Sequence, residues 1–594
     1  MRLRPGRLVA AAWALCSAVM LWIFHGSFVA LGFRDPDDAM RLTQVRDWIG
    51  GQSWFDVTQY RVYPPAGGPM HWSRIVDLPI ADIILTFRPF LGMAGAEILA
   101  CIIVPLLLLG ALTWATYRAA GRIGGTAVAL VSVALLLTNP SILVQFTPMR
   151  IDHHGWQILM AAVALGGLFD PRAARGGMVA GLALAVWLQI SSEGLPYAAL
   201  FAGVLALQQW MERREARRFV TYAVTLGIAA LALLMATRGA SALWAQNCDA
   251  LSYIYIWPLL GLSVASLIAV RLIGNATPAR RFAVPAIGGL CAVAIFLVTG
   301  GSCLSGDPFA ALGPLAYRYW YLQVMEGRPI WEQGLSMAGV ILLTPVIGLV
   351  GTLGAAGANR DGARRDWLML ALLLGGTMAV SILVMRAMSV AHLFALPGIA
   401  WLLITLFRRV QASRMAMVRV FGSVALAALT PFGLAALWVS IATKPDAKTE
   451  ATNTTDCREA ATLAPLKALS PALLFAPIDM GPDILVQTRH AVTGTAHHRN
   501  AAGITAVLEG YMAPPAKAQQ VIERLNGGGG AAYVITCSGL NEMGMYVKDS
   551  PHGLAAVLAR GEVPAWLTQL PTHGPLKIYR VLPATKRIAT PFMQ

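Results

Sequence analysis

Charged residues are scarce in this chain of 594 residues, because Asp, Glu, Lys and Arg together make up only 13% of it. Soluble proteins contain roughly 25%. Hydrophobic residues account for 57% of the chain, and the mean hydropathy is +0.61. These values exclude a soluble globular enzyme, a disordered chain and a coiled coil. They indicate a polytopic helical membrane protein.

Lysine is absent from the first 443 residues, where arginine carries the basic charge. The hydropathy falls at the same place. We therefore predict a membrane domain over 1–443 and a soluble C-terminal α/β domain over 444–594, long enough to form a core of its own. All seven lysines follow Ser440, at Lys444, Lys448, Lys467, Lys517, Lys548, Lys577 and Lys586.

Two binding motifs are missing as well. The sequence contains no P-loop and no GxGxxG pattern, so nucleotide chemistry is not indicated. The formal net charge is +16, but no basic run is interleaved with aromatic residues. We therefore expect no nucleic-acid partner and assign the excess of arginine to cytoplasmic loops.

The chain begins MRLRPGR and continues with an apolar stretch over residues 8–31. A signal peptide has a similar start, but this stretch is too long for its apolar core and no A-x-A site closes it, so we predict a retained first span. Twelve further apolar stretches bring the expected number of spans to thirteen. They lie near 92–117, 123–140, 155–169, 176–190, 194–210, 219–237, 252–270, 282–299, 336–356, 367–385, 388–407 and 418–441.

Arginine alternates between successive connections. With Met1 inside, every inside connection is rich in arginine, as the positive-inside rule requires. This orientation predicts an inner-membrane protein with a cytoplasmic N-terminus and a periplasmic C-terminal domain. The arginines are Arg118 and Arg122, Arg172 and Arg175, the run 211–218, Arg271, Arg280 and Arg281, Arg360, Arg364 and Arg365, and Arg408, Arg409 and Arg414.

Two predicted outer loops, 32–89 and 300–335, are far longer than a connection needs, and such loops usually carry function. The first opens with Asp35, Asp37 and Asp38 directly after the first span. These carboxylates either bind a divalent cation or act as a base, or they only cap a solvated helix start. The second contains Glu326 and Glu332 among aromatic residues that an interfacial belt explains.

Three further sites carry charge at the predicted outer boundary. Asp152, His153 and His154 begin the fourth span, either as metal ligands or as a helix cap with histidines at the headgroups. Glu193 lies between two apolar stretches, where it either faces water or takes part in chemistry. Arg386 lies at the outer end of a span, against the arginine bias, and either binds a lipid phosphate or reaches the headgroups. A candidate metal site and a candidate contact for a lipid phosphate on the same side of the membrane together indicate the transfer of a group from a phosphorylated lipid donor.

The order of these motifs resembles that of the catalytic subunit of oligosaccharyltransferases, membrane glycosyltransferases of the GT-C fold with thirteen spans and an extracytoplasmic C-terminal domain. RDPDDAMRLTQVRDWIGGQSWFD resembles the family's first acidic motif, MRIDHHGW the second, and VMEGRPIW the outer-loop motif that ends in Glu. The resemblance implies that Asp35, Asp152 and His154 bind Mg²⁺ or Mn²⁺. It also implies that Glu326 holds the acceptor and that Arg386 contacts the donor phosphate.

The C-terminal part departs from that family. The family's W-W-D-Y-G segment reads the acceptor, whereas the corresponding stretch here is PIDMGPDIL, with Asp479 but no tryptophan pair. His498 and Arg499 in HHRN stand near the family's N-R-T segment. In the second acidic motif, His154 stands where the family has a carboxylate. Asp479, His498 and Arg499 are the candidate acceptor contacts, and we expect the acceptor to be a protein, a lipid or a polysaccharide.

Short apolar runs predict the C-terminal fold. Residues 472–476, 531–537 and 576–582 read as buried strands, and 517–525 and 554–560 as helices. The glycine run 527–530 reads as a turn rather than a phosphate cradle. Cys457 and Cys537 are the two cysteines of this domain and are predicted to pair, and Cys248 and Cys303 are candidates for a second disulfide.

The sequence therefore predicts a GT-C membrane glycosyltransferase that uses a sugar or glycan on a polyprenyl phosphate or pyrophosphate. Asp35 or Asp38 would activate the acceptor, and Glu326 would position it. A transporter or lipid flippase is the alternative from another class, although the acidic groups lie at the outer boundary and no internal repeat is evident. A non-catalytic relative acting as a scaffold is the third hypothesis.

Overall fold

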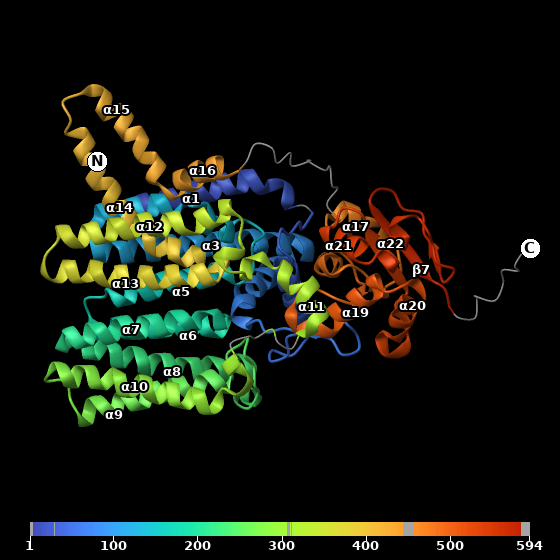
Figure 1. Ribbon diagram of the computed structural model, residues 1–594, viewed down its shortest axis with the longest axis horizontal. Helices are drawn as coiled ribbons and strands as arrows, with labels where there is room; N and C mark the ends of the chain where they lie inside the picture. The colour runs from blue at the N-terminus through green and yellow to red at the C-terminus, as the bar shows by residue number, and fades with distance from the viewer. Residues whose placement is uncertain (1–3, 29, 306–308, 310–311, 444–456, 584–594) are drawn as a thin grey trace, which may run out of the picture.

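The computed structural model describes residues 4–28, 30–305, 309, 312–443 and 457–583. A bundle of long helices forms one end of an elongated molecule, and an α/β region over residues 457–583, called the C-terminal region below, forms the other end (Figure 1). The predicted class, a polytopic helical membrane protein with a small α/β part, is confirmed.

Apolar helices build the bundle, because a helix satisfies all its backbone polar groups internally and so suits lipid. They are α1 (Pro5–Phe24), α3 (Arg74–Leu136), α5 (His154–Leu168), α6 (Ala173–Ile190), α7 (Leu195–Met211), α8 (Ala216–Arg238), α9 (Tyr253–Leu272), α10 (Pro278–Thr299), α12 (Leu335–Ala358), α13 (Asp361–Leu383), α14 (Met388–Gln411), α15 (Ala416–Ala425) and α16 (Pro431–Ala442), with the short α4 (Pro140–Leu143) between α3 and α5.

The expected thirteen spans are not confirmed. Within the described ranges, nine helices are long and apolar enough to cross a membrane, or ten if the bent pair α15–α16 is one span. Two expected spans fall within α3, whose 63 residues are broken at Gly92 and Gly125. Both glycines have positive φ, of 70° and 78°, a conformation that other residues rarely adopt. The predicted fourth span is the 15-residue α5, which is short for a bilayer.

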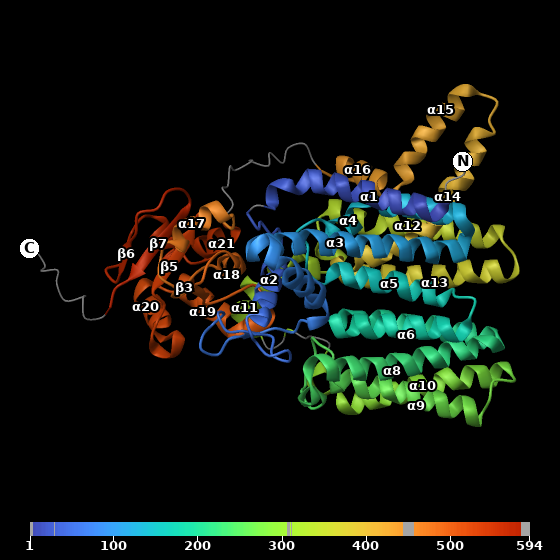
Figure 2. The same cartoon turned by 180° about the vertical axis from the view of Figure 1, so that it is seen from behind.

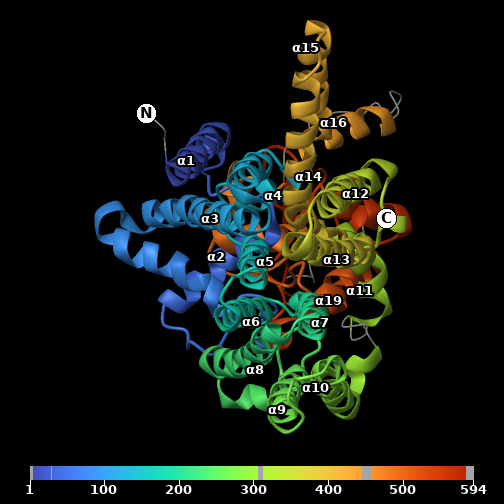
Figure 3. The same cartoon turned by 90° about the vertical axis from the view of Figure 1, so that its left-hand side faces the viewer.

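The arginine-rich connections meet at the end of the bundle away from the C-terminal region (Figure 1). Arg122 of α3 pairs with Asp170 in the α5–α6 connection at 2.8 Å, and Arg218 of α8 donates to the Asp170 carbonyl at 2.7 Å. The side of the membrane that this end faces remains a prediction. At the same end, α15 projects away from the other helices, and α16 is bent by 80° from it (Figure 3).

The described residues of both predicted outer loops lie between the bundle and the C-terminal region (Figures 1 and 2). The first contains α2 (Pro36–Ile49), the two-residue strands β1 (Thr58–Gln59) and β2 (Gly68–Pro69), and the start of α3. The second contains α11 (Gly313–Tyr319) and several 3₁₀ turns, and α11 packs against α19 of the C-terminal region.

A five-stranded sheet, in the order β4-β3-β5-β7-β6, forms the core of the C-terminal region (Figure 2). β3 pairs in parallel with β4 and β5, while β7 is antiparallel to β5 and β6. The strands are β3 (Leu473–Phe475), β4 (Ala491–Val492), β5 (Tyr533–Cys537), β6 (Leu567–Gln569) and β7 (Leu576–Val581); the helices are α17 (Ala460–Lys467), α18 (Gly481–Gln487), α19 (Ala501–Met512), α20 (Pro515–Arg524), α21 (Asn541–Asp549) and α22 (Leu554–Ala559).

The local predictions for this region are confirmed. The three predicted strands correspond to β3, β5 and β7, and the two predicted helices to α20 and α22. Gly527, Gly528 and Gly530 have positive φ and form a turn that leads into β5 rather than into a helix. Both disulfides are present, Cys457–Cys537 and Cys248–Cys303.

The first outer loop is joined to the sheet. The Tyr63 amide donates to the Val492 carbonyl at 2.8 Å, and the Val492 amide donates to the Arg61 carbonyl at 2.8 Å. Arg46 of α2 holds both oxygens of Glu97 at 2.7 Å and also donates to the Val486 carbonyl at 2.6 Å. The position of α2, which carries the aspartates, therefore depends on both the bundle and the C-terminal region.

Candidate active site

The aspartates of the first loop lie at the start of α2. Asp35 is the N-cap, and its Oδ1 accepts the Asp37 amide at 2.9 Å. Asp38 is one turn further on and only 1% exposed. Its Oδ1 accepts the amides of Ile151 and Asp152 at 2.8 and 2.9 Å. Asp38 therefore fixes the loop before α5 against α2.

Arg150, which the sequence analysis did not single out, joins three of the predicted carboxylates. Its guanidinium lies 2.6 Å from Asp35, 3.1 Å from Asp38 and 2.8 Å from Asp152. We call these four residues the acidic cluster. A signal for Arg150 was available, since it is an arginine on the predicted outer side, against the bias that identified Arg386.

The acidic cluster shifts the ionisation of its own members. Burial raises the pKa of Asp38 well above its ordinary range, although Arg150 opposes the shift. Burial also works against ionisation of Asp152, but Arg150 and the neighbouring histidines bring its pKa below the ordinary value. Of these two carboxylates, Asp152 therefore keeps its negative charge more readily than Asp38.

Asp37 points toward the C-terminal region instead. His497 Nε2 lies 3.1 Å from its Oδ1. Burial opposes ionisation of Asp37, but the hydrogen bond and charge of His497 lower the pKa of this carboxyl far below its usual range. His497, directly before the predicted His498, thus ties the HHRN segment to α2.

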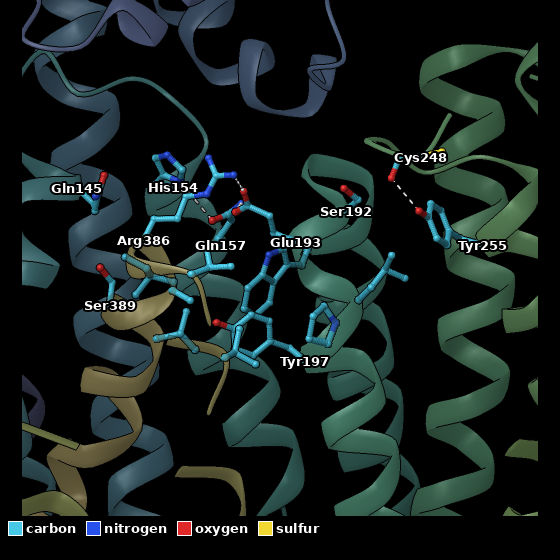
Figure 4. Close-up of a pocket in the computed structure, with 18 of the residues that line it drawn as sticks. Gln145, His154, Gln157, Ser192, Glu193, Tyr197, Cys248, Tyr255, Arg386 and Ser389 are labelled. Atoms are coloured by element: carbon cyan, nitrogen blue, oxygen red, sulfur yellow. Dashed lines mark hydrogen bonds and ion pairs between the residues drawn. The ribbon is translucent and has the colours of Figure 1, made fainter. Parts of the chain in front are cut away.

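A second group of charges surrounds Arg386, which lies in a 3₁₀ turn directly before α14. Arg386 Nη2 lies 2.6 Å from Glu193, and its Nη1 lies 3.4 Å from Glu326 in the second outer loop. Gln157 links Glu193, at 3.1 Å, to His154, at 3.3 Å (Figure 4). His154 Nε2 in turn lies 3.7 Å from Asp152. The residues around Arg386 are thus connected to the acidic cluster.

Two cavities are lined by these charged residues. The larger, of about 390 Å³, lies between α5, α6, α7, α13 and α14 and has Arg386, Glu193 and His154 on its wall (Figure 4). The smaller, of about 250 Å³, is lined by Asp35, Asp38, Arg150 and Glu326. Gln145 lines both. We call them the Arg386 cavity and the carboxylate cavity.

The walls of the Arg386 cavity are mostly apolar away from this charged edge. Ile158, Leu195, Val380, Val384 and Val390 line it. Arg386 Nε is buried and has no hydrogen-bond partner among the described residues. A buried donor without a partner is unfavourable, so it marks a place for a ligand acceptor. The cavity therefore suits a molecule with an anionic group and an apolar part.

The predicted acceptor contacts, Asp479, His498 and Arg499, do not share one set of partners. His498 Nε2 lies 2.7 Å from Asp249, and Arg499 holds both oxygens of Asp249 at 2.6 and 2.7 Å. Asp249 lies in the α8–α9 connection, so these two residues join the C-terminal region to the bundle. Asp479 follows β3, and its amide donates to Glu542 at 2.9 Å. Asp479 lines neither cavity.

One group of side chains within the described ranges has ligand atoms close enough for a metal ion: those of His71, Asp249 and His498 lie within 4.8 Å of one another. Burial first, and then the charge of His498, lowers the pKa of His71 well below its ordinary value, so its imidazole is neutral and available as a ligand. The predicted ligands Asp35, Asp152 and His154 are not in this group, and Arg150 pairs with Asp35 at 2.6 Å and with Asp152 at 2.8 Å.

No protein-family model matches the sequence, and the search of curated proteins finds no match. Solved structures do match. A structure of the Archaeoglobus fulgidus oligosaccharyltransferase tethered to an acceptor peptide with an NVT sequon has a TM-score of 0.62 at 14% identity, over 93% of this chain and 72% of that one. A structure of the same organism's oligosaccharyltransferase in complex with an inhibitory peptide and a dolichol-phosphate has a TM-score of 0.62 at 14% identity. That match covers 94% of this chain and 72% of that one.

A third structure, of the Archaeoglobus fulgidus oligosaccharyltransferase with Zn and sulfate, has a TM-score of 0.53 at 14% identity over 96% of this chain and 74% of that one. At this identity the likeness is one of fold. It extends over nearly the whole chain, so the membrane bundle and the C-terminal region are both part of the shared fold. The resemblance predicted from the motif order is confirmed at that level.

Proposed function

We propose that this chain is a membrane glycosyltransferase that transfers a sugar or glycan from a polyprenyl phosphate or pyrophosphate to an acceptor. The observation that carries the proposal is the Arg386 cavity: an apolar space between membrane helices, with an unpartnered arginine nitrogen on its wall and two half-buried carboxylates, Glu193 and Glu326, beside that arginine. The similarity in fold to an oligosaccharyltransferase bound to dolichol-phosphate supports it.

Arg386 binds the donor phosphate in this proposal. Its guanidinium is held at one edge by Glu193, which leaves Nε without a partner. An arginine in this state offers a charge-assisted hydrogen bond to a phosphate oxygen. The isoprenoid chain lies against the apolar walls. Glu193 and Glu326 keep the guanidinium in place before the donor arrives, so little reorganisation is needed when it binds.

Asp35, Asp152 and His154 hold a divalent cation, Mn²⁺ or Mg²⁺, in this proposal. The types of donor suit such an ion, since carboxylates with an imidazole suit Mn²⁺, and His154 Nε2 lies 3.7 Å from Asp152 Oδ2. Arg150 supplies the positive charge now and has to share the carboxylates with the ion. When bound, the ion neutralises the charge that develops on the leaving phosphate. A similar fold with Zn and sulfate supports a metal here.

Asp35 rather than Asp38 orients and activates the acceptor nucleophile. Both oxygens of Asp38 are engaged, one by two amides and the other by Arg150, and Asp38 is 1% exposed. The Asp35 side chain is 29% exposed and lines the carboxylate cavity. Glu326 lines the same cavity and positions the acceptor. The bond from the sugar to the phosphate breaks, the sugar joins the acceptor, and the acceptor's proton passes to Asp35.

The acceptor is a protein, a lipid or a polysaccharide, and it enters from the carboxylate cavity. His498 and Arg499 take part indirectly, by placing the C-terminal region through Asp249. Asp479 lies further away, so we propose that it affects acceptor binding rather than chemistry. The predicted periplasmic location of this end agrees with a donor carried on a lipid.

The experiment is turnover of radiolabelled polyprenyl-linked sugars by the purified protein with membrane extract, with Mn²⁺ and with a chelator. We expect metal-dependent loss of label from the lipid, abolished by Asp35→Asn or Arg386→Gln. Asp47→Asn is the matched control, because Asp47 lies on α2 but lines neither cavity. No consumption across a broad donor panel by folded protein would contradict the proposal and favour a transporter or a scaffold.

A further inference from the structure

Three side chains from distant parts of the chain meet where the C-terminal region contacts the bundle. His71 lies in the first outer loop between β2 and α3, Asp249 in the α8–α9 connection, and His498 in the HHRN segment. Each is half-buried, and one nitrogen or oxygen of each lies within 4.8 Å of the others. Within the described ranges, no other group of three or more histidine, cysteine and carboxylate side chains comes this close. We call these residues the His–Asp–His cluster.

The His71 imidazole is held in place without the use of its nitrogens. Arg238, at the end of α8, donates to the carbonyl of His71 and to that of Trp72, the latter at 2.8 Å, so the backbone at His71 is fixed to the bundle. The His71 ring packs against the His498 ring, with centroids 4.7 Å apart. The described residues make no hydrogen bond to either nitrogen of the His71 ring. Ring packing explains the contact but leaves these nitrogens available to a ligand.

Asp249 can accept a cation although two basic side chains already contact it. Arg499 Nε lies 2.6 Å from its Oδ2 and Nη2 2.7 Å from its Oδ1, while His498 Nε2 lies 2.7 Å from Oδ2. A carboxylate has about four lone-pair sites, so Arg499 can keep both bonds while the third partner changes.

The spacing of the cluster suits a small cation. A hydrogen atom lies between His498 Nε2 and Asp249 Oδ2 at their distance of 2.7 Å, and a metal ion would take its place. Zn²⁺ binds nitrogen and oxygen at about 2.0–2.2 Å in a tetrahedron, so its ligand atoms stand about 3.4 Å apart. That value falls between the gap of 2.7 Å and the upper limit of 4.8 Å for the whole cluster, so small side-chain rotations are enough to reach it.

We propose that His71, Asp249 and His498 form a zinc site that fastens the C-terminal region to the first outer loop and to the bundle. Two imidazoles with one carboxylate are typical ligands of Zn²⁺, whereas Mg²⁺ and Ca²⁺ prefer oxygen ligands alone. The cluster is half-buried, so water can occupy the fourth position. Arg499 then orients the ligating carboxylate. The site shares no residue with the acidic cluster, so it is separate from the cation site proposed above.

The test measures the melting temperature of the purified full-length protein in detergent, stripped of metal with a chelator, with and without Zn²⁺ as the only added metal. Zinc should raise the melting temperature of wild type by a few degrees, because a ligand that binds only the folded state stabilises it. His71→Gln should lose this shift and melt like wild type in the absence of zinc, because the His71 ring makes no hydrogen bond to the described residues. His552→Gln is the matched control and should keep the shift, since His552 is exposed and lies outside the cluster.

Equilibrium dialysis against Zn²⁺ gives a second readout that does not depend on thermal unfolding. Outer partners of a metal site change affinity 10- to 100-fold, so the loss of a ligand in His71→Gln should weaken zinc binding about 100-fold or more. Asp152→Asn alters the separate acidic cluster and should keep the zinc shift. An equal shift in wild type and His71→Gln, or no shift in wild type, would overturn the zinc site. Loss of the shift in Asp152→Asn instead of His71→Gln would overturn it too, because the zinc would then lie in the acidic cluster.

Discussion

Replacing Asp38 by alanine should destabilise the protein more than replacing Asp35, although the two residues are only three positions apart at the start of α2. Asp38→Ala leaves the buried amides of Ile151 and Asp152 without their acceptor. Each unsatisfied amide costs about 1–3 kcal/mol. Arg150 also loses a contact at 3.1 Å. We expect a total loss of about 3–6 kcal/mol in the free energy of unfolding.

Asp35→Ala removes an N-cap, worth about 0.5–2 kcal/mol. It also removes a pair with Arg150, but the Asp35 side chain is 29% exposed. Such a pair contributes about 0–1 kcal/mol, so the expected loss is about 0.5–3 kcal/mol in all. Arg150 keeps Asp38 and Asp152 in this variant.

The assay is a denaturant titration of purified protein in mixed micelles, combined with donor turnover. Asp35→Ala should unfold close to the wild-type denaturant midpoint and lose donor turnover. Asp38→Ala should unfold at a clearly lower denaturant concentration than either wild type or Asp35→Ala. Asp47→Ala, on the same helix, controls for the loss of an aspartate. If the two variants unfold within about 1 kcal/mol of each other, the roles assigned from the hydrogen bonds of Asp38 are wrong.

Three further predictions concern other parts of the molecule. Arg386→Lys should lower turnover about 100-fold because a lysine cannot reproduce the guanidinium contacts, while Arg328→Lys, whose partner is Glu332, should stay near wild type in the same assay. The double variant Cys457→Ser, Cys537→Ser removes a disulfide that closes a loop with a sequence separation of 80, so the free energy of unfolding of the C-terminal region should fall by about 2–5 kcal/mol. An unchanged denaturant midpoint for that region would refute this prediction. Burial first, and then Asp479, raises the pKa of Glu542 to about 8 from an ordinary 4.5, so its contribution to stability is complete below pH 4.5 and is lost as the pH rises through about 8. Glu542→Gln should flatten that part of a melting-temperature profile, and a slope equal to that of wild type would contradict the assignment.

The sequence alone determined the features that depend on local composition. The scarcity of charge identified a helical membrane protein, because lipid excludes charged side chains and unpaired backbone groups. The absence of lysine before residue 444 and the change in hydropathy located the C-terminal region. Short apolar runs gave β3, β5 and β7, and the cysteines on the predicted outer side gave both disulfides. The number of spans did not follow from the sequence, because apolar composition alone does not show where the backbone breaks, as it does at Gly92 and Gly125 within α3.

Only the tertiary structure decided how the candidate site is connected. Arg150 and Asp38 are 112 residues apart, and Arg499 and Asp249 are 250 apart, so no local pattern could pair them. The choice between Asp35 and Asp38 depended on which carboxylate is buried against the loop before α5. The unpartnered Nε of Arg386 and the approach of His71 to Asp249 and His498 became visible only once the helices and the C-terminal region were packed. A side chain's type is written in the sequence, but whether its polar atoms find partners depends on neighbours that folding brings from elsewhere in the chain.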